Sequence, residues 1–281
     1  MAELELERKT ATRTPEPDAA IDRPADRDVD FTLEHYREIL AALKERHLPL
    51  SFKDAHELGR DILKLDRFVL LRHDVEFSLT SALRMARLDH EAGVRSTFFL
   101  LLSSDYNVFE PAGAAIVRQI LDLGHDVGLH YDMAAYEQNG TDPVEIARQQ
   151  IALLESYFST RVYAMSSHMP MRSGKTLRLP DVVDVYDPLY VDEIKYVSDS
   201  TQKWREGVVT SLLGEHDRIH LLTHEYYWSE DGHAFDVLLL QEARRKYDEL
   251  AERAEANIRT FKQGLKLRAV RDAEFRRRLG R

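Results

Sequence analysis

The apolar run Phe68–Leu71 leads directly into Arg-His-Asp-Val-Glu at residues 72–76, and this junction constrains the fold more than any other stretch of the chain. Packing alone does not require a buried strand to end in polar residues. In an extended strand, residues i and i+2 point to the same side, so we expect Asp74 and Glu76 to present two carboxylates to one place. Two carboxylates at one place attract a cation, so the end of this strand is a candidate metal site.

Three other apolar runs end in the same way. They close at His130, with Asp132 two residues later, at His168 and at His224. In a parallel α/β protein the carboxyl ends of the strands open on one face, and sites are built there. We therefore expect carboxylates and imidazoles from four strands to meet at one end of a parallel sheet.

Strands and helices alternate along most of the chain. The expected strands are Phe68–Arg72, Ser96–Leu102, Asp126–His130, Val162–Met165, Val182–Val185, Ile194–Val197 and Ile219–Leu222. The expected helices are Thr32–Arg46, Ser51–Lys64 with Asp54 completing a capping box, Ser78–Ala92, Pro111–Leu123, Pro143–Tyr157 and Val237–Phe261. This order predicts an α/β fold in which about seven parallel strands form a barrel, preceded by two extra helices and followed by a long one. The barrel is expected to be irregular because residues 170–188 lack a clear helical pattern.

Length and charge fit one enzyme domain without a polyanionic partner. A chain of 281 residues can bury a sizeable core as a single unit. The net charge of −10 argues against nucleic acid and against an anionic membrane, because both require a basic surface. The chain has no cysteine, so histidine and carboxylate are the strong metal ligands that remain. The oligomeric state is left open.

The two ends of the chain are predicted to lie outside the folded domain. Residues 1–30 are rich in Glu, Asp, Pro and Ala, which predicts a disordered tail. No stretch there resembles a signal peptide or an anchor, and no apolar run reaches the roughly 20 residues of a membrane span. We therefore expect a cytoplasmic protein. Residues 31–265 are expected to form the domain, and residues 266–281 a solvated basic tail.

Four segments in this order resemble the polysaccharide deacetylase family, carbohydrate esterase family 4 (CE4), in a divergent branch. They are Leu-Arg-His-Asp-Val-Glu (71–76), Gly-Val-Arg-Ser-Thr-Phe-Phe (93–99), Tyr-Asn-Val-Phe (106–109) and Gly-His-Asp-Val-Gly-Leu-His-Tyr-Asp (124–132). The resemblance covers roughly residues 68–228. It implies a distorted (β/α)7 barrel and a divalent metal that serves to hydrolyse N-acetyl groups of sugars.

The resemblance also implies roles for single residues. Asp74 corresponds to the catalytic base and Glu76 to the metal-binding acid, which is more usually aspartate. His224, in a Leu-x-His motif, corresponds to the general acid, and Asp199 with Trp204 to the segment that orients it. His130 corresponds to the first histidine of a His-x-x-x-His metal motif.

The second histidine of that motif is absent, because position 134 is alanine. His168 is the first choice to replace it, since it also closes a strand, and Asp132 is the second. His125 is the third choice because it precedes its strand. The metal is expected to be zinc, with cobalt, nickel or manganese as alternatives. Bound zinc lowers the pKa of its water toward 7 and polarises a carbonyl.

The residues expected to line the substrate site are Arg72, Tyr106, Asn107, Tyr131 and Trp228. Arg72 is also expected to hold Asp74 in place. Two functions follow from these interpretations. The first is a metal-dependent deacetylase acting on a soluble N-acyl sugar, sugar nucleotide or related amide. The alternative is a catalytically altered barrel that binds or remodels a glycan precursor in surface-polysaccharide or secondary-metabolite synthesis.

Overall fold

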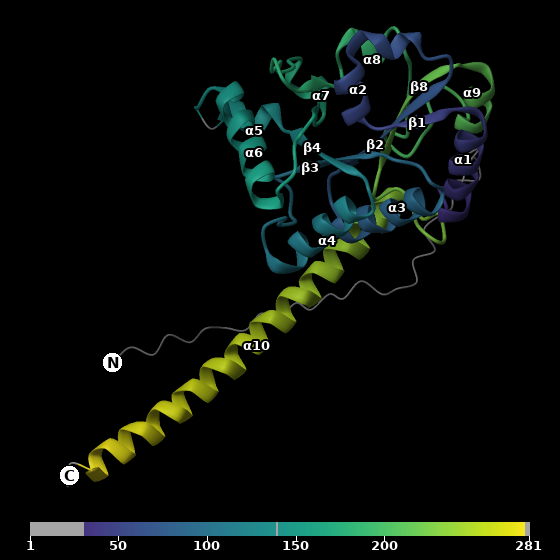
Figure 1. The fold of residues 1–281 in the computed structure, drawn as a ribbon. Coiled ribbons are helices and arrows are strands. Elements are labelled where there is room, and N and C mark those ends of the chain that lie inside the picture. The colour runs from purple at the N-terminus through teal and green to yellow at the C-terminus, as the bar shows by residue number, and fades with distance from the viewer. Residues whose placement is uncertain (1–30, 139, 279–281) are drawn as a thin grey trace, which may run out of the picture.

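A curled sheet of parallel strands forms the centre of the molecule, and the computed structural model describes residues 31–138 and 140–278 (Figure 1). The strands are β1 (Leu48–Leu50), β2 (Phe68–Val75), β3 (Thr97–Leu101), β4 (Asp126–Tyr131), β5 (Ala164–Ser167), β6 (Val183–Asp184), β7 (Lys195–Ser198) and β8 (Arg218–His224). The order across the sheet is β6-β5-β4-β3-β2-β8-β7, and β1 pairs with the beginning of β2. Within the described residues β6 and β7 are not hydrogen-bonded to each other, so the sheet is a half-barrel rather than a closed ring.

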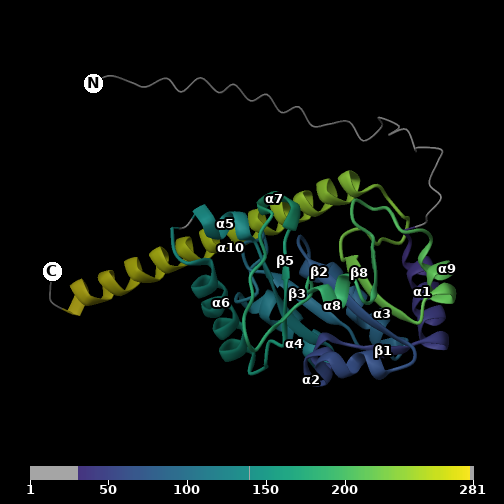
Figure 2. The same cartoon turned by 90° about the horizontal axis from the view of Figure 1, so that it is seen from above.

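Helices lie on both the outer and the inner side of this sheet, and the last one projects from the body (Figures 1 and 2). They are α1 (Leu33–Arg46), α2 (Phe52–Leu58), α3 (Leu79–Glu91), α4 (Pro111–Asp122), α5 (Met133–Gln138), α6 (Pro143–Phe158), α7 (Pro170–Ser173), α8 (Pro188–Val191), α9 (Val209–Glu215) and α10 (Phe235–Arg278), with a 3-10 helix at Gly59–Lys64. Local capping explains several starts: the side chains of Thr32, Ser78 and Asp142 accept backbone N–H groups of α1, α3 and α6. Among the described residues, no helix combines the length and apolarity that a membrane crossing requires.

The two faces of β2 serve two different cores. Val69, Leu71 and Val75 face outward and join the larger core beneath the helices, whereas Phe68 and Leu70 face the interior of the half-barrel. Phe52 of α2 packs in that interior with its ring 5.8 Å from that of Phe99. A Cβ at Gly128 would lie 2.5 Å from the Phe99 ring, so only glycine lets this ring cross β4. The interior of the half-barrel is therefore apolar at the amino ends of the strands, and its polar groups lie at their carboxyl ends.

The predicted fold class is confirmed, with an α/β half-barrel of parallel strands, N-terminal helices and a long C-terminal helix. The predicted capping box is also present, because Asp54 Oδ2 accepts the backbone N–H of Ser51 at 2.8 Å.

The short strand β1 was not predicted, since three residues give no alternating pattern. Helix α10 runs to Arg278 and so includes most of the segment expected to be a basic tail. Residues 1–30, expected to be disordered, lie outside the described residues.

A buried polar network lies on the outward face of β2. Asp89 of α3 is fully buried and accepts hydrogen bonds from Tyr36 Oη at 2.7 Å, from His73 Nε2 at 2.8 Å and from Ser96 Oγ at 2.6 Å. Burial alone would raise the pKa of Asp89, but the neighbouring His73 and these hydrogen bonds hold it below its usual value. Asp89 therefore links α1, α3 and two strands through one buried carboxylate.

We expect Asp89→Ala to lower the free energy of unfolding by about 3–5 kcal/mol at pH 7, because it leaves buried partners unpaired. Asp122→Ala, at the exposed end of α4, is the matched control and should change it by less than about 0.5 kcal/mol. Folding lowers the pKa of Asp89, so the ionised carboxylate contributes to the free energy of unfolding. This contribution is complete above the pKa of an unfolded carboxyl and is lost as the pH falls through the lower pKa of the folded protein. Urea titrations of both variants at pH 7 and below about pH 4 measure this. A loss under about 1 kcal/mol at pH 7 would contradict the role of Asp89.

Candidate functional site

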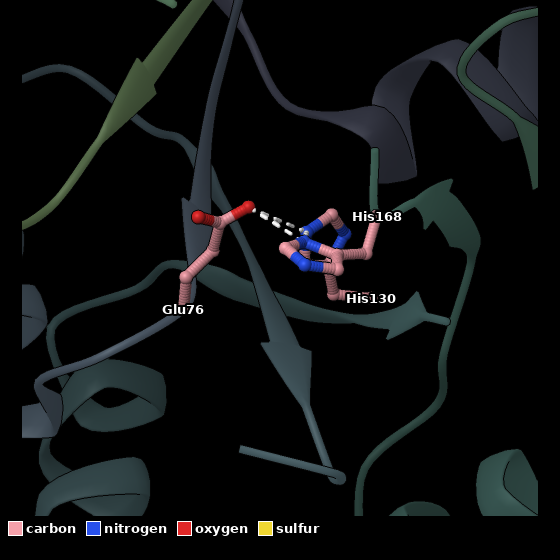
Figure 3. Close-up of side chains that lie close together, drawn as sticks. All are labelled: Glu76, His130 and His168. Carbon is pink, nitrogen blue, oxygen red and sulfur yellow. Dashed lines mark hydrogen bonds and ion pairs between the residues drawn. The ribbon is translucent and has the colours of Figure 1, made fainter. Parts of the chain in front are cut away.

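Three side chains expected to bind a metal come together at the carboxyl end of the half-barrel (Figure 3). Glu76 follows β2, His130 lies in β4, and His168 follows β5. Glu76 Oε1 lies 2.8 Å from His168 Nδ1 and 3.3 Å from His130 Nε2, and the two histidine nitrogens are 3.3 Å apart. The alternative third ligand, Asp132, is used differently: its Oδ1 accepts the backbone N–H groups of Ala134 and Ala135 at the start of α5.

The backbone fixes both imidazoles. His130 Nδ1 lies 3.0 Å from the carbonyl oxygen of Ser166 and must donate to it, so its Nε2 presents a lone pair toward Glu76 when the ring is neutral. The backbone N–H of His168 donates to the carbonyl of Tyr131 at 2.8 Å. The next residue, Met169, has φ 45°, a left-handed conformation that is costly for a side chain other than glycine. Such backbone strain beside His168 is common at functional sites.

The three donor atoms fit a divalent metal. A deprotonated Glu76 and a neutral His130 would place two acceptors 3.3 Å apart, which requires a proton or a cation between them. Burial favours a higher pKa for Glu76, yet with no metal present the hydrogen bonds that His168 and a protonated His130 donate hold that pKa well below its usual range. Two imidazole nitrogens and one carboxylate oxygen form a common catalytic zinc set, and tetrahedral ligands about 2.1 Å from zinc lie roughly 3.4 Å from one another. Two of the observed separations, 3.3 Å each, are close to that spacing, and the third, between Glu76 and His168, is shorter at 2.8 Å.

Asp74 lies in the half-barrel interior beside this triad and is buried. Its Oδ2 accepts a hydrogen bond from Ser166 Oγ at 3.0 Å, and Ser166 Oγ in turn accepts one from Arg72 Nη1 at 2.8 Å. Its Oδ1 has no hydrogen-bond partner among the described residues, which is uncommon for a buried carboxylate. Asp74 therefore has one fixed oxygen and one oxygen left for a water or a substrate.

His224 stands opposite Asp74, because the two residues are partners in the register of β2 and β8. Asp199, after β7, is fully buried and lies 2.6 Å from His224 Nδ1, and Oδ2 of Asp199 accepts the indole N–H of Trp228 at 3.0 Å. Burial acts to lower the pKa of His224, but the charge and hydrogen bond of Asp199 outweigh it and raise the pKa to about 9. The imidazole is therefore protonated at neutral pH, with Nε2 directed away from Asp199.

Two residues at the site were not assigned a role from the sequence. Glu225 is fully buried, and its carboxylate accepts the backbone N–H groups of Glu76, Phe77 and Ser78, which fixes the loop that carries Glu76. Burial raises the pKa of Glu225 to about 7. Ser166 joins Arg72 to Asp74 and orients His130. The only sequence signal for these residues is their place at strand ends beside stronger candidates.

Four of the five residues expected to line the substrate site are engaged in the fold instead. Arg72, Tyr131 and Trp228 are inaccessible to solvent, since Arg72 donates to Ser166 and Tyr186, Tyr131 Oη accepts the N–H of Leu177, and Trp228 donates to Asp199. The hydroxyl of Tyr106 donates to the carbonyl of Val75 and accepts the N–H of Leu101. Burial of Arg72, Tyr131 and Trp228 speaks against a lining role for these three, whereas the lining role of the partly buried Tyr106 stays a prediction. Asn107 is exposed after β3, where its side chain accepts the N–H of Phe109.

Two further expectations need correction. His125, the third choice as a ligand, lies in the network of Asp89, where Nε2 donates to the carbonyl of Ala86 at 2.8 Å and Nδ1 faces Ser96. The tryptophan that contacts Asp199 is Trp228 rather than Trp204, which stacks on Phe31 at 6.0 Å. Both differences arise because the contact partners of His125 and Asp199 are determined by packing between elements that are distant in sequence.

Comparisons with known proteins give structural matches only. No family model matches the sequence, and no curated protein matches it. A CE4 esterase from Streptococcus mutans is 15% identical with a TM-score of 0.40, covering 74% of this chain and 90% of that one. A chitin deacetylase from Colletotrichum lindemuthianum is 18% identical with a TM-score of 0.34, covering 63% and 81%.

A CE4 family pseudoenzyme from Bacillus anthracis is 15% identical with a TM-score of 0.39, covering 64% of this chain. The match spans 62% of that protein, slightly less than two thirds of its length. A mutant of the same pseudoenzyme with restored enzymatic activity matches with a TM-score of 0.39 as well. The chain is thus structurally similar to CE4 polysaccharide deacetylases, a pseudoenzyme among them, at low sequence identity.

Proposed function

We propose that the protein is a metal-dependent deacetylase that hydrolyses the N-acetyl, or another N-acyl, group of a sugar, sugar nucleotide or related amide. The observation that supports this most is the meeting of three kinds of group at one end of the half-barrel. A triad of metal-ligand type, a buried carboxylate with a free oxygen and a protonated imidazole lie at the carboxyl ends of β2, β4, β5 and β8. Amide hydrolysis needs an activated water, a base and an acid for the leaving nitrogen.

Glu76, His130 and His168 would hold the metal, and zinc suits this donor set best, with cobalt, nickel or manganese as alternatives. A metal bound there supplies polarisation of the amide carbonyl and a lowered pKa of a water. Ser166 and Glu225 keep the ligands in place, because one orients His130 and the other fixes the loop of Glu76. Supporting contacts of this kind tune the affinity of a metal site.

Asp74 acts as the general base in this proposal. Ser166 holds its Oδ2, and Oδ1 is free to accept the proton of the attacking water. The nearby guanidinium of Arg72, 3.7 Å from Oδ2, favours the ionised carboxylate. His224 acts as the general acid, since its protonated Nε2 can donate to the departing nitrogen while Asp199 stabilises the imidazolium.

The second candidate function is a deacetylase-like barrel that binds or remodels a glycan precursor without hydrolysis. Ala134 at the place of the family's second histidine favours it, as does the burial of the aromatic residues expected to stack on a sugar. A cytoplasmic location, and with it a soluble substrate, is part of both proposals. Release of a carboxylic acid from an N-acyl sugar by metal-loaded protein decides between the two functions.

We predict that His130→Ala and His168→Ala each weaken zinc binding by at least about tenfold, as loss of a ligand should. The measurement is competition for zinc against a chromophoric chelator, with folding checked by circular dichroism. Asp132→Ala is the control, because the Asp132 side chain caps α5 and should leave zinc affinity nearly unchanged. Weaker zinc binding in Asp132→Ala, with parent-like zinc binding in His168→Ala, would make Asp132 the third ligand.

We predict that Asp74→Asn keeps zinc affinity and loses turnover by roughly 10²–10⁴-fold, because an amide has the shape of the carboxylate but cannot accept the proton. Acetate release from N-acetylated sugars by zinc-loaded protein measures turnover. Asp122→Asn changes an exposed carboxylate at the end of α4, before the amino end of β4, and is the matched control. Parent-like rates in Asp74→Asn would remove Asp74 as the base.

We predict an alkaline limb in the pH profile of kcat/KM, at or below the pKa of about 9 that Asp199 gives His224, because a bound metal lowers it further. Asp199→Asn should shift this limb to lower pH, since the anion that favours the protonated imidazole is removed. His224→Ala should abolish the limb and reduce kcat by roughly 10²-fold or more. A limb that stays in place in Asp199→Asn would mean that another group titrates.

A further inference from the structure

An apolar stripe runs along helix α10, and no other part of the described chain covers it. The apolar stripe consists of Leu240, Ala243, Tyr247, Leu250, Ala254, Ile258, Phe261 and Leu265. Successive members are three or four residues apart, so they share one face of the helix. All of them are exposed, and the exposed fraction is 70% for Leu240 and 68% for Phe261. A contiguous apolar surface of this kind marks an interaction site.

The second half of α10 receives no support from the half-barrel. Lys246 donates to the carbonyl of Phe77 and Arg253 to Glu110, and these charged contacts lie on a different face from the apolar stripe. Every residue from Glu252 to Arg278 is exposed, and Figures 1 and 2 both show this part of the helix projecting away from the body. Most helices in proteins owe their stability to packing of an apolar face. A projecting apolar helix therefore indicates a partner.

The charges of α10 indicate what kind of partner. An acidic block, consisting of Asp248, Glu249, Glu252 and Glu255, is followed by a basic block, consisting of Arg259, Lys262, Lys266, Arg268 and Arg271. The only basic residue within the span of the acidic block is Arg253, which pairs with Glu110 on the body. No acidic residue interrupts the basic block. The helix is therefore complementary to itself when one copy is turned end to end.

We propose that two copies of this chain associate through antiparallel pairing of their α10 helices, with the two-fold axis near residue 256. In that register the apolar pairs are Tyr247 with Leu265, Leu250 with Phe261 and Ala254 with Ile258, each from opposite copies. The same register places Asp248 by Lys266, Glu252 by Lys262 and Glu255 by Arg259, all on one flank of the apolar stripe. At about 1.5 Å per residue, the paired part of the stripe, from Tyr247 to Leu265, offers a seam of roughly 27 Å. Parallel pairing would instead place the two acidic blocks side by side and the two basic blocks side by side, so that like charges repel.

An anionic membrane is the other surface that a basic amphipathic helix fits. The acidic block disfavours it, because Asp248, Glu252 and Glu255 flank the apolar stripe and would be repelled by anionic lipid. The net charge of −10 acts in the same direction. A second copy of α10 would cover the apolar stripe and pair both charged blocks, whereas a membrane would cover only the stripe. We therefore infer that the partner is a second copy.

The first test is the mass of the full chain in solution. Light scattering and sedimentation equilibrium should give twice the chain mass of 32.6 kDa. Leu265→Lys should raise the dimer dissociation constant at least about tenfold, because it places a charge in an apolar seam. Leu267→Lys is the matched control: Leu267 is 68% exposed, against 51% for Leu265, but lies on the opposite side of the helix, so it should leave dimerisation unchanged.

The second test fixes the direction of pairing. The chain has no cysteine, so Tyr247→Cys and Leu265→Cys introduce the only thiols. On mild oxidation the double variant should form a disulfide-linked dimer, whereas neither single variant should. Cross-linking of each single variant alone would show parallel pairing and overturn the proposal. A monomer at about 100 μM would also overturn it, as would monomeric binding to phosphatidylserine vesicles through the apolar stripe.

Discussion

The site depends on the central position of β2, which is hydrogen-bonded to β8 along its whole length and to β3 near its carboxyl end. Because side chains alternate along a strand, this one element sends Phe68 and Leu70 into an apolar interior and then Arg72 and Asp74 into its polar end. The outward side of the same strand is held by the hydrogen bond between His73 and Asp89. A change of register by one residue would exchange the two faces and remove the site.

Several buried charges surround the site, and most are neutralised by short contacts with specific partners. Asp199 is satisfied by His224 and Trp228, Glu225 by three backbone N–H groups, and Asp74 by Ser166 and the nearby Arg72. Among the described residues, Oδ1 of Asp74 and Nε of Arg72 are buried there without a hydrogen-bond partner. Unsatisfied carboxylate oxygens are uncommon in folded proteins, so Oδ1 of Asp74, beside the triad, marks a place for a water or a substrate.

The third candidate ligand comes from the strand next to the one that carries His130. Residue 134 is alanine, and His168 at the end of the adjacent strand β5 supplies an imidazole to the same point. The two histidines meet because neighbouring parallel strands end at the same edge, a few ångströms apart. A motif based on spacing within one segment therefore does not describe these candidate ligands. Met169 adopts a left-handed conformation directly after His168, which suggests that this position is held by the surrounding fold.

The sequence by itself determined the main strands and helices along the chain and the carboxyl-end location of the site, because strand periodicity and polar strand ends are local patterns. The candidate roles of Asp74, Glu76, His130 and His224 also came from the sequence. Only the tertiary structure decided that His168 rather than Asp132 joins the triad and that Trp228 rather than Trp204 contacts Asp199. It also decided that Arg72, Tyr131 and Trp228 are buried and that α10 continues to Arg278 with its apolar stripe exposed. These outcomes depend on which side chains meet across segments far apart in the chain, and no local pattern carries that information.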